Sequence, residues 1–250
     1  AASTPPTTPS SFVTTASISG SFNVGTGEVY TSLTNAGGAF AGINGAAVTG
    51  NIVLNITTDL TAETGLNALN QFASPFTVTI NPVVAARTIS GALASAALIK
   101  LNGADRVTIN GSIGGAGTDK SLTITNTSIT SPTAIALISL GTGAGANTNT
   151  IKNCNISTGV SAATGFGIAV GGTTPGLNGA DNDNVTIQNN TITIATTPIY
   201  AIGTAAVSAG GNDNLVITGN TVTTNTTIQN FGIQVGNGLK SSISQNTVSV

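Results

Sequence analysis

Carboxylates are the side chains of this sequence best placed to do chemistry, because several of them recur in register. Asp105, Asn147, Asp183 and Asp213 each stand four residues before an isoleucine of a repeated motif, and Asp181 and Asp183 flank Asn182. Stacked carboxylates could bind Ca²⁺ or a sugar, whereas an aspartate at an exposed turn accepts hydrogen bonds from nearby backbone N–H groups. We expect the turn role and keep Asp181, Asp183 and Asp213 as candidate metal ligands, with Ca²⁺ as the cofactor they would suit.

Bases that could act with these carboxylates are scarce. The chain has no histidine, and its six basic residues are scattered along it: Arg87, Lys100, Arg106, Lys120, Lys152 and Lys240. Arg106 directly follows Asp105, and an exposed pair of this kind is usually solvated. Acid–base catalysis needs two groups with opposed pKa values in one cleft, so we predict no catalytic residues.

The composition excludes several classes of partner. Charged residues make up only 6% of the 250 residues, the formal charge is −2, and 40% of residues are hydrophobic. A neutral surface offers no electrostatic basis for binding nucleic acid, and this hydrophobic content argues against disorder. No run of about 18 apolar residues is present, so we predict no membrane span.

Cysteine usage and the first residues indicate a compartment. Cys154 is the only cysteine, which excludes an intrachain disulfide, and its place at a repeated corner predicts a buried, inert thiol. The opening AASTPPTTPS is interpreted as a mature product after signal-peptide removal, or as an expression product. With few lysines and many threonines and asparagines, the chain is expected outside the cell, on a bacterial surface.

Three segments differ in pattern. Residues 1–24 combine a Pro/Thr-rich linker with an alternating strand in which Ala16, Ile18, Phe22 and Val24 share one side. Residues 25–86 are expected to form an N-terminal cap with one stretch of helical spacing at 33–43 and first strands at 50–56 and 76–80. Residues 87–250 are expected to form repeated coils.

The repeat gives the strongest prediction. Its central isoleucines are Ile109, Ile151, Ile187, Ile217 and Ile243, and three residues after each stand Ser112, Cys154, Asn190, Asn220 and Asn246. Stacked coils would pair each strand with its equivalent about 4.8 Å away and bury isoleucine on isoleucine. Asparagines at the corner would tolerate left-handed backbone and hydrogen-bond the same corner of the next coil. The pattern predicts an all-β solenoid, a parallel β-helix.

These motifs also carry a resemblance. The corners NGADRVTINGS, NNTI and GNTV, with the entry segment SLTNAGGAFAGIN, resemble right-handed parallel β-helix repeat proteins secreted to bacterial surfaces. That group includes the pectate-lyase-like superfamily, so the resemblance implies a right-handed coil, best matched over residues 87–250. Hydrolases of that superfamily use clustered aspartates with a histidine and a basic pair, and its lyases use Ca²⁺ with an Arg or Lys base. Because this chain has no histidine and scattered bases, the resemblance specifies the fold and not the function.

We therefore expect a non-enzymatic extracellular protein with a structural or adhesive role. The last coil, SSISQNTVSV, has no polar cap, so we expect either that the chain is a fragment of a longer protein or that a partner covers this end. The second alternative favours head-to-tail self-association into a filament or surface layer. The strand at residues 14–24 could then pair with a neighbouring subunit. The alternatives are a polysaccharide lyase or hydrolase and a binder of a polysaccharide or other surface receptor.

Two further features, a pair of phenylalanines and the threonines of the strands, are not predicted to bind a ligand. Phe166 and Phe231 occupy equivalent positions and are expected to stack in the core rather than contact a ligand. Ordered threonine ladders could bind ice, but a flat array of two threonine columns is not evident in the sequence.

Overall fold

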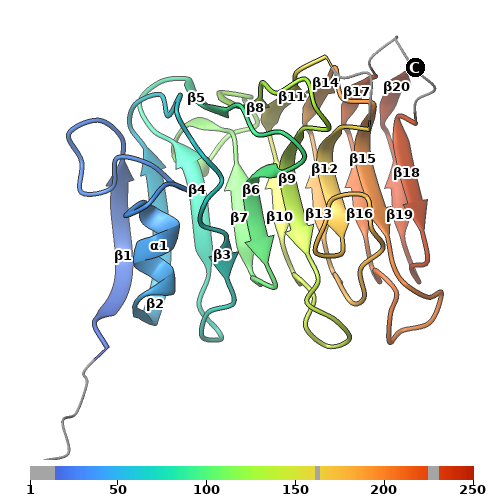
Figure 1. Cartoon of the computed structure of the whole chain (residues 1–250), viewed down its shortest axis with the longest axis horizontal. Coiled ribbons are helices and arrows are strands. Elements are labelled where there is room, and N and C mark those ends of the chain that lie inside the picture. Colours follow the sequence, from blue (N-terminus) through green and yellow to red (C-terminus); the bar gives the residue numbers. More distant parts are fainter. Residues whose placement is uncertain (1–14, 161–163, 225–230) are drawn as a thin grey trace, which may run out of the picture.

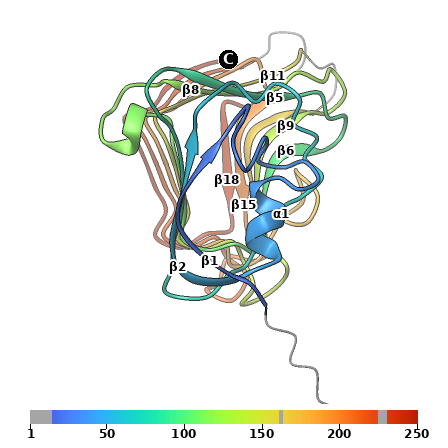
Figure 2. The same cartoon turned by 90° about the vertical axis from the view of Figure 1, so that its left-hand side faces the viewer.

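The chain folds into a parallel β-solenoid of about seven turns, as the repeat predicts. The computed structural model describes residues 15–160, 164–224 and 231–250. Figure 1 shows the coils stacked from β1 at one end to β20 at the other. Figure 2, which looks along the stack, shows three walls around one core.

Each wall is one parallel sheet. The first sheet contains, in order, β1 (Ser17–Val24), β2 (Ala47–Ile56), β4 (Val78–Pro82), β7 (Val107–Asn110), β10 (Thr150–Lys152), β13 (Thr186–Gln188), β16 (Val216–Thr218) and β19 (Ser242–Ser244). The second contains β5 (Arg87–Gly91), β8 (Leu122–Asn126), β11 (Cys154–Thr158), β14 (Thr191–Thr193), β17 (Thr221–Thr223) and β20 (Thr247–Ser249). The third contains β3 (Leu69–Asn70), β6 (Ala97–Asn102), β9 (Thr133–Ile138), β12 (Phe166–Gly171), β15 (Thr197–Ile202) and β18 (Ile233–Gly236).

The strand register follows the predicted isoleucine column. Ile109 pairs with Ile151, and the column continues through Ile187, Ile217 and Ile243. Because successive strand residues face opposite sides, these isoleucines point inward and all but the last are fully buried. Burying each side chain contributes roughly 1.5–3 kcal/mol, so the columns supply most of the driving force for stacking.

The last coil differs from those before it in exposure. Ile243 and Val248 continue the inner columns, but they are 51% and 46% exposed, since among the described strands none lies beyond β19 and β20. Their equivalents one coil earlier, Ile217 and Val222, are fully buried. The described part of the chain therefore presents apolar surface at this end of the stack.

The solenoid continues upstream of residue 87, where the sequence placed its start. Leu54 of β2 pairs with Ile80 of β4, which pairs with Ile109, so the cap and the coils share one sheet. The alternating strand predicted before residue 24 is β1, and it pairs in parallel with β2 of its own chain. Ala16 stands just before β1, at the end of the stack.

In the part of the chain that the structure describes, helical structure is confined to one short element and one turn. The α-helix α1 (Ala39–Asn44) begins after Gly38 and buries Phe40 and Ile43. It starts later than the helical spacing suggests, because Gly37 adopts a left-handed φ of 69° that breaks the preceding turn. A 3₁₀ turn, η1 (Ile113–Gly115), lies in the loop before β8. Among the described residues, no helix has the length and apolar character needed to cross a membrane.

Candidate functional site

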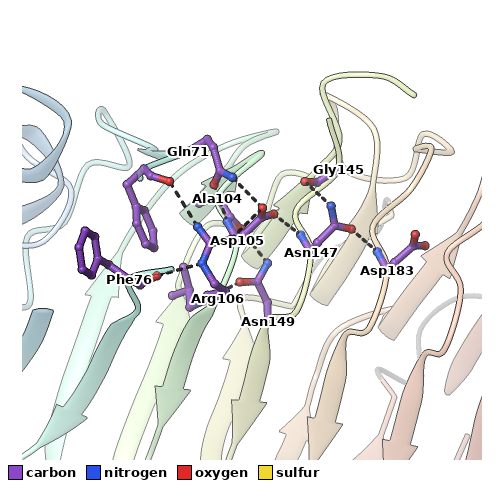
Figure 3. Close-up of polar contacts among 11 residues, drawn as sticks. Gln71, Phe76, Ala104, Asp105, Arg106, Gly145, Asn147, Asn149 and Asp183 are labelled. Carbon is purple, nitrogen blue, oxygen red and sulfur yellow. Dashed lines mark hydrogen bonds and ion pairs between the residues drawn. The ribbon is translucent and has the colours of Figure 1, made fainter. Parts of the chain in front are cut away.

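The recurring carboxylates form a continuous polar ladder along one edge of the solenoid (Figure 3). The side-chain oxygen of each member accepts the backbone N–H of the equivalent residue one coil further on. The bonds run from Asp105 N to Gln71 Oε1 at 2.9 Å, and at 2.7 Å each from Asn147 N to Asp105 Oδ1, Asp183 N to Asn147 Oδ1, Asp213 N to Asp183 Oδ1 and Leu239 N to Asp213 Oδ1. We call Asp105, Asn147, Asp183 and Asp213 the acidic ladder, and its bonds link coils through backbone N–H groups.

Asp181 and Asp183 do not converge on a common point. Asp181 is buried, and its two carboxylate oxygens accept the N–H groups of Gly143 at 2.6 Å and Gly210 at 2.5 Å. Those glycines lie in the loops of the preceding and following coils, so the two hydrogen bonds of Asp181 link three coils. Within the part of the chain that the structure describes, no three His, Cys, Asp or Glu residues are grouped so as to hold a metal ion.

Arg106 is tied into the fold more closely than a solvated neighbour of Asp105 would be. Its Nη1 lies 3.3 Å from Asp105 Oδ2, and its Nε donates to the carbonyl oxygen of Phe76 at 2.9 Å. The guanidinium also lies 5.5 Å from the ring centroid of Phe72 and donates to the Phe72 carbonyl. The prediction of a solvated pair is therefore wrong: Arg106 fastens the 72–76 segment to the ladder and is not free to act as a base.

The ladder has an electrostatic cost at Asp183. Removal from water is the main reason that the pKa of Asp183 is raised; the N–H of Asp213 opposes this change, and the carboxylates of Asp213 and Asp181 add to it. The Asp183 carboxylate thus has a structural partner and unfavourable charged neighbours.

Exchange of Asp183 for asparagine is expected to preserve the fold and to raise the free energy of unfolding at pH 7 by at most about 1 kcal/mol, since the group is only half-buried and solvent screens its charge. Asn147 already fills the equivalent position with an amide oxygen that accepts the next N–H. Because its folded-state pKa is raised, wild-type Asp183 contributes stability below its ordinary pKa of 3.8, and this is lost as the pH rises through the raised value. Urea unfolding should therefore show the gain at pH 7 and little difference near about pH 3. If the variant is less stable than the wild type only when Ca²⁺ is present, the result would support an ion site at Asp183 instead.

The second repeated position forms a corner ladder, defined as Cys154, Asn190, Asn220 and Asn246. Backbone N–H groups donate to the next asparagine's Oδ1, from Cys154 to Asn190 at 3.0 Å, from Asn190 to Asn220 at 2.9 Å and from Asn220 to Asn246 at 2.9 Å. Each asparagine Nδ2 also donates to a carbonyl of the preceding coil; that of Asn190, for example, reaches Ile151 O at 2.9 Å. The expected bonding between equivalent corners is thus present.

The left-handed backbone occurs one residue before the corner ladder and not at the ladder itself, contrary to prediction. Asn153, Asn189 and Gln245 have φ of 57°, 51° and 56°, and Gly219 has 65°. The residue that turns the chain is separate from the residue that bonds the coils, because the turn aims the next side chain inward. Burial raises the pKa of the Cys154 thiol to about 12, which agrees with the predicted inert thiol.

Sequence reasoning missed two polar features. Glu63 is buried, and its carboxylate accepts the backbone N–H groups of Leu33 at 2.8 Å and Thr34 at 2.6 Å, together with the Thr34 hydroxyl. A second amide ladder joins Asn189 to Asn153 and Asn153 to Asn110, both at 2.8 Å. The asparagines directly before Cys154 and Asn190 were the available signal for this ladder, whereas Glu63 has no repeated equivalent.

A groove of about 750 Å³ lies on the outer side of the third sheet. Phe166 and Tyr200 meet edge-to-face there with their ring centroids 5.3 Å apart, and the Tyr200 hydroxyl lies 2.8 Å from Asn178 Oδ1. Phe166 is buried in a small hydrophobic cluster with Ala169 and Tyr200, as its predicted packing role requires. Phe231 also lines the groove and is 58% exposed, so the expectation of a core stack is wrong for Phe231. Both phenylalanines face outward because the glycine that follows each of them, Gly167 or Gly232, faces the core: a Cβ on Gly167 would meet Ile192, and one on Gly232 would meet Val248.

None of the described residues that line the groove is acidic or basic. The buried hydroxyl of Thr133 also lines the groove, and it has no hydrogen-bond partner among the residues that the structure describes. Aromatic rings beside hydroxyl and amide groups suit a neutral, polar ligand better than a charged one.

The fold and these polar ladders define a parallel β-solenoid whose ionisable side chains mainly join coils. Comparisons with protein-family profiles, curated proteins and solved structures find no match to the chain.

Proposed function

We propose that the chain is a non-enzymatic extracellular solenoid with a structural or adhesive role. The observation that supports this most directly is the use of its carboxylates. Seven of the eight accept a backbone N–H group: Asp59, Glu63, Asp105, Asp119, Asp181, Asp183 and Asp213. Carboxylates engaged in this way hold loops and coils in place, and none is paired with a free base across a cleft.

The setting follows from the resemblance and the composition. Similarity of the repeat to secreted bacterial β-helix proteins of the pectate-lyase-like superfamily supports a cell-surface location. A surface with 6% charged residues also provides little repulsion between copies, which favours self-association.

Self-association is proposed to use the ends of the sheets. In the described residues β1 and β19 are the outermost strands of the first sheet, and both run parallel to their neighbours. Outermost strands carry unpaired backbone groups that can pair with a further strand. Stacking a second copy on the last coil would bury Ile243 and Val248.

Size-exclusion chromatography with light scattering, together with electron microscopy, tests the association. The wild type is expected to form end-to-end assemblies, and the double variant Ile243→Lys, Val248→Lys is expected to stay monomeric because it places like charges on the apolar end. Val207→Lys is the matched control, since Val207 is an exposed loop residue and its exchange should leave assembly unchanged. A monomeric wild type at high concentration would contradict the proposal of self-association.

Incubation with pectins and other polysaccharides, with Ca²⁺ present, tests the non-enzymatic role. No product release is expected, whereas release that is lost in Asp183→Ala would establish a lyase or hydrolase. The uncharged aromatic groove favours glycan binding as the second candidate function, and retention on a glycan array that falls in Phe231→Ala would support it.

A further inference from the structure

The outer face of the second sheet carries two straight columns of small polar side chains. Strand register aligns the first column as Thr88, Thr123, Asn155, Thr191, Thr221 and Thr247, and the second as Ser90, Thr125, Ser157, Thr193, Thr223 and Ser249. We call these twelve residues the hydroxyl array. Eleven of them carry a hydroxyl group, and none carries a charge.

The array is regular in two dimensions. Equivalent side chains on neighbouring strands lie about 4.8 Å apart, and the two columns lie about 6.7 Å apart because they are two residues apart along each strand. The residue between the columns points inward in every strand and is an isoleucine or valine, which fixes the pleat. Figure 2 shows β5, β8 and β11 along the top wall, and the six strands of the second sheet are consecutive neighbours, so the array extends over six strands.

The side chains of the array are accessible to solvent, and a loop borders the array along its first column. All twelve are half-buried or exposed, and within the second column the Thr125 and Ser157 hydroxyls lie 2.9 Å apart. The loop before β8 borders the first column, where Lys120 Nζ donates to Thr191 Oγ1 at 2.9 Å. No such contact reaches Thr193 in the second column among the described residues.

The array is not a simple consequence of the fold. The outer face of the first sheet has the same parallel register, and one of its columns holds four threonines between Val53 and Val216, namely Thr79, Thr108, Thr150 and Thr186. Beside these threonines, the neighbouring column carries amides and Lys152 instead of hydroxyl groups, so no paired hydroxyl columns form there. The third sheet turns Phe166 and Tyr200 outward and has the groove on this side. High β-propensity explains threonine in strands generally, but not the pairing of two adjacent hydroxyl columns on one of three faces.

We propose that the hydroxyl array binds ice. Each threonine presents a methyl group and a hydroxyl group side by side, so the face can exclude disordered water and hydrogen-bond ordered water. The two spacings of the array are close to oxygen repeats on faces of hexagonal ice. The side chains are fixed by sheet pairing and β-branching before binding, so little conformational entropy is lost on contact with a rigid lattice.

The twelve positions of the array carry no charge, which favours ice over an ionic mineral or an anionic polymer, because charged groups hold hydration shells that do not fit the lattice. Two charged residues lie beside the array, Lys120 at Thr191 and Asp59 at Thr88, and both lie along the first column, so the proposed contact centres on the second. This inference goes beyond the proposed structural or adhesive role and does not require self-association.

Measurement of thermal hysteresis and ice-crystal shape in solutions of the purified chain tests the inference. The wild type is expected to hold the freezing point below the melting point and to produce faceted crystals. Thr193→Tyr should lose both effects, because the ring projects from the middle of the second column and prevents close contact. Thr186→Tyr is the matched control on the outer face of the first sheet, and it should retain both effects.

Circular dichroism and urea unfolding establish that each variant is folded. If Thr193→Tyr does not fold, Thr223→Lys at an exposed site of the same column takes its place, with the same loss expected. No hysteresis in the wild type, or equal hysteresis in folded array variants, would overturn the inference. Binding to crystalline chitin or cellulose without any effect on ice would also overturn it and would assign the face to a polysaccharide surface.

Discussion

Replacing Asn190 by alanine is expected to lower the free energy of unfolding by about 3 kcal/mol, because two buried backbone groups lose their partners. Asn190 is fully buried; its Oδ1 accepts the N–H of Cys154, and its Nδ2 donates to Ile151 O. Nδ2 also lies 3.1 Å from Asn220 Oδ1, so the exchange removes one link from the middle of the corner ladder.

Urea unfolding followed by circular dichroism measures this loss. Asn55→Ala is the matched control, because Asn55 lies on the outer face of β2 and its side chain makes no hydrogen bond with the described residues. Its exchange should change the free energy of unfolding by less than about 0.5 kcal/mol. Equal effects of the two exchanges would show that the corner ladder adds little to stability and that the isoleucine columns alone hold the coils.

Replacing Glu63 by alanine is expected to destabilise the N-terminal cap by roughly 3–5 kcal/mol, a cost typical of removing one partner from a buried charged network. Two backbone N–H groups and the Thr34 hydroxyl would be left facing an uncharged cavity. Leu33 and Thr34 are themselves fully buried, so water does not replace the carboxylate without opening the cap.

Glu63→Gln separates the role of charge from that of shape. Glutamine keeps one acceptor but points an amide N–H₂ at a backbone donor, so the loss should be smaller than for alanine but clear. Glu28→Ala is the control, because the Glu28 carboxylate only accepts a 3.3 Å hydrogen bond from Asn23 Nδ2 at the surface. Full stability in Glu63→Ala would mean that the segment around Leu33 is held by packing alone.

The sequence was sufficient to predict what repeats. Ile109 and its successors recur because each coil must bury the same position, so the fold class and the register of the first sheet follow from the pattern. The corner ladder was found for the same reason. Features that occur once, such as Gln71 at the start of the acidic ladder and Glu63 in the cap, depend on tertiary contacts and leave no periodic signal.

The hydroxyl array shows a different limit. Its columns are visible in the last three coils, but Asn155 and Ser157 replace threonine in β11, and inserted loops displace β5 and β8 along the sequence. Only the strand pairing shows that Thr88 and Thr123 belong to the same column. The sequence also did not show which groups each carboxylate would contact. Asp181 and Asp183 are only two residues apart, yet Asp181 accepts the N–H groups of Gly143 and Gly210. Asp183 instead accepts the N–H of Asp213, the next member of the acidic ladder.

The placement of β1 and β20 at opposite ends of the stack has a mechanical consequence (Figure 1). A pulling force applied to the two ends of the chain passes through the coils in series. Each coil is held to the next by strand pairs in three sheets and by ladder bonds at the corners, so the coils should peel away one after another. Such a protein would absorb work in steps under tension, and the loops of unequal length between strands would set the size of each step.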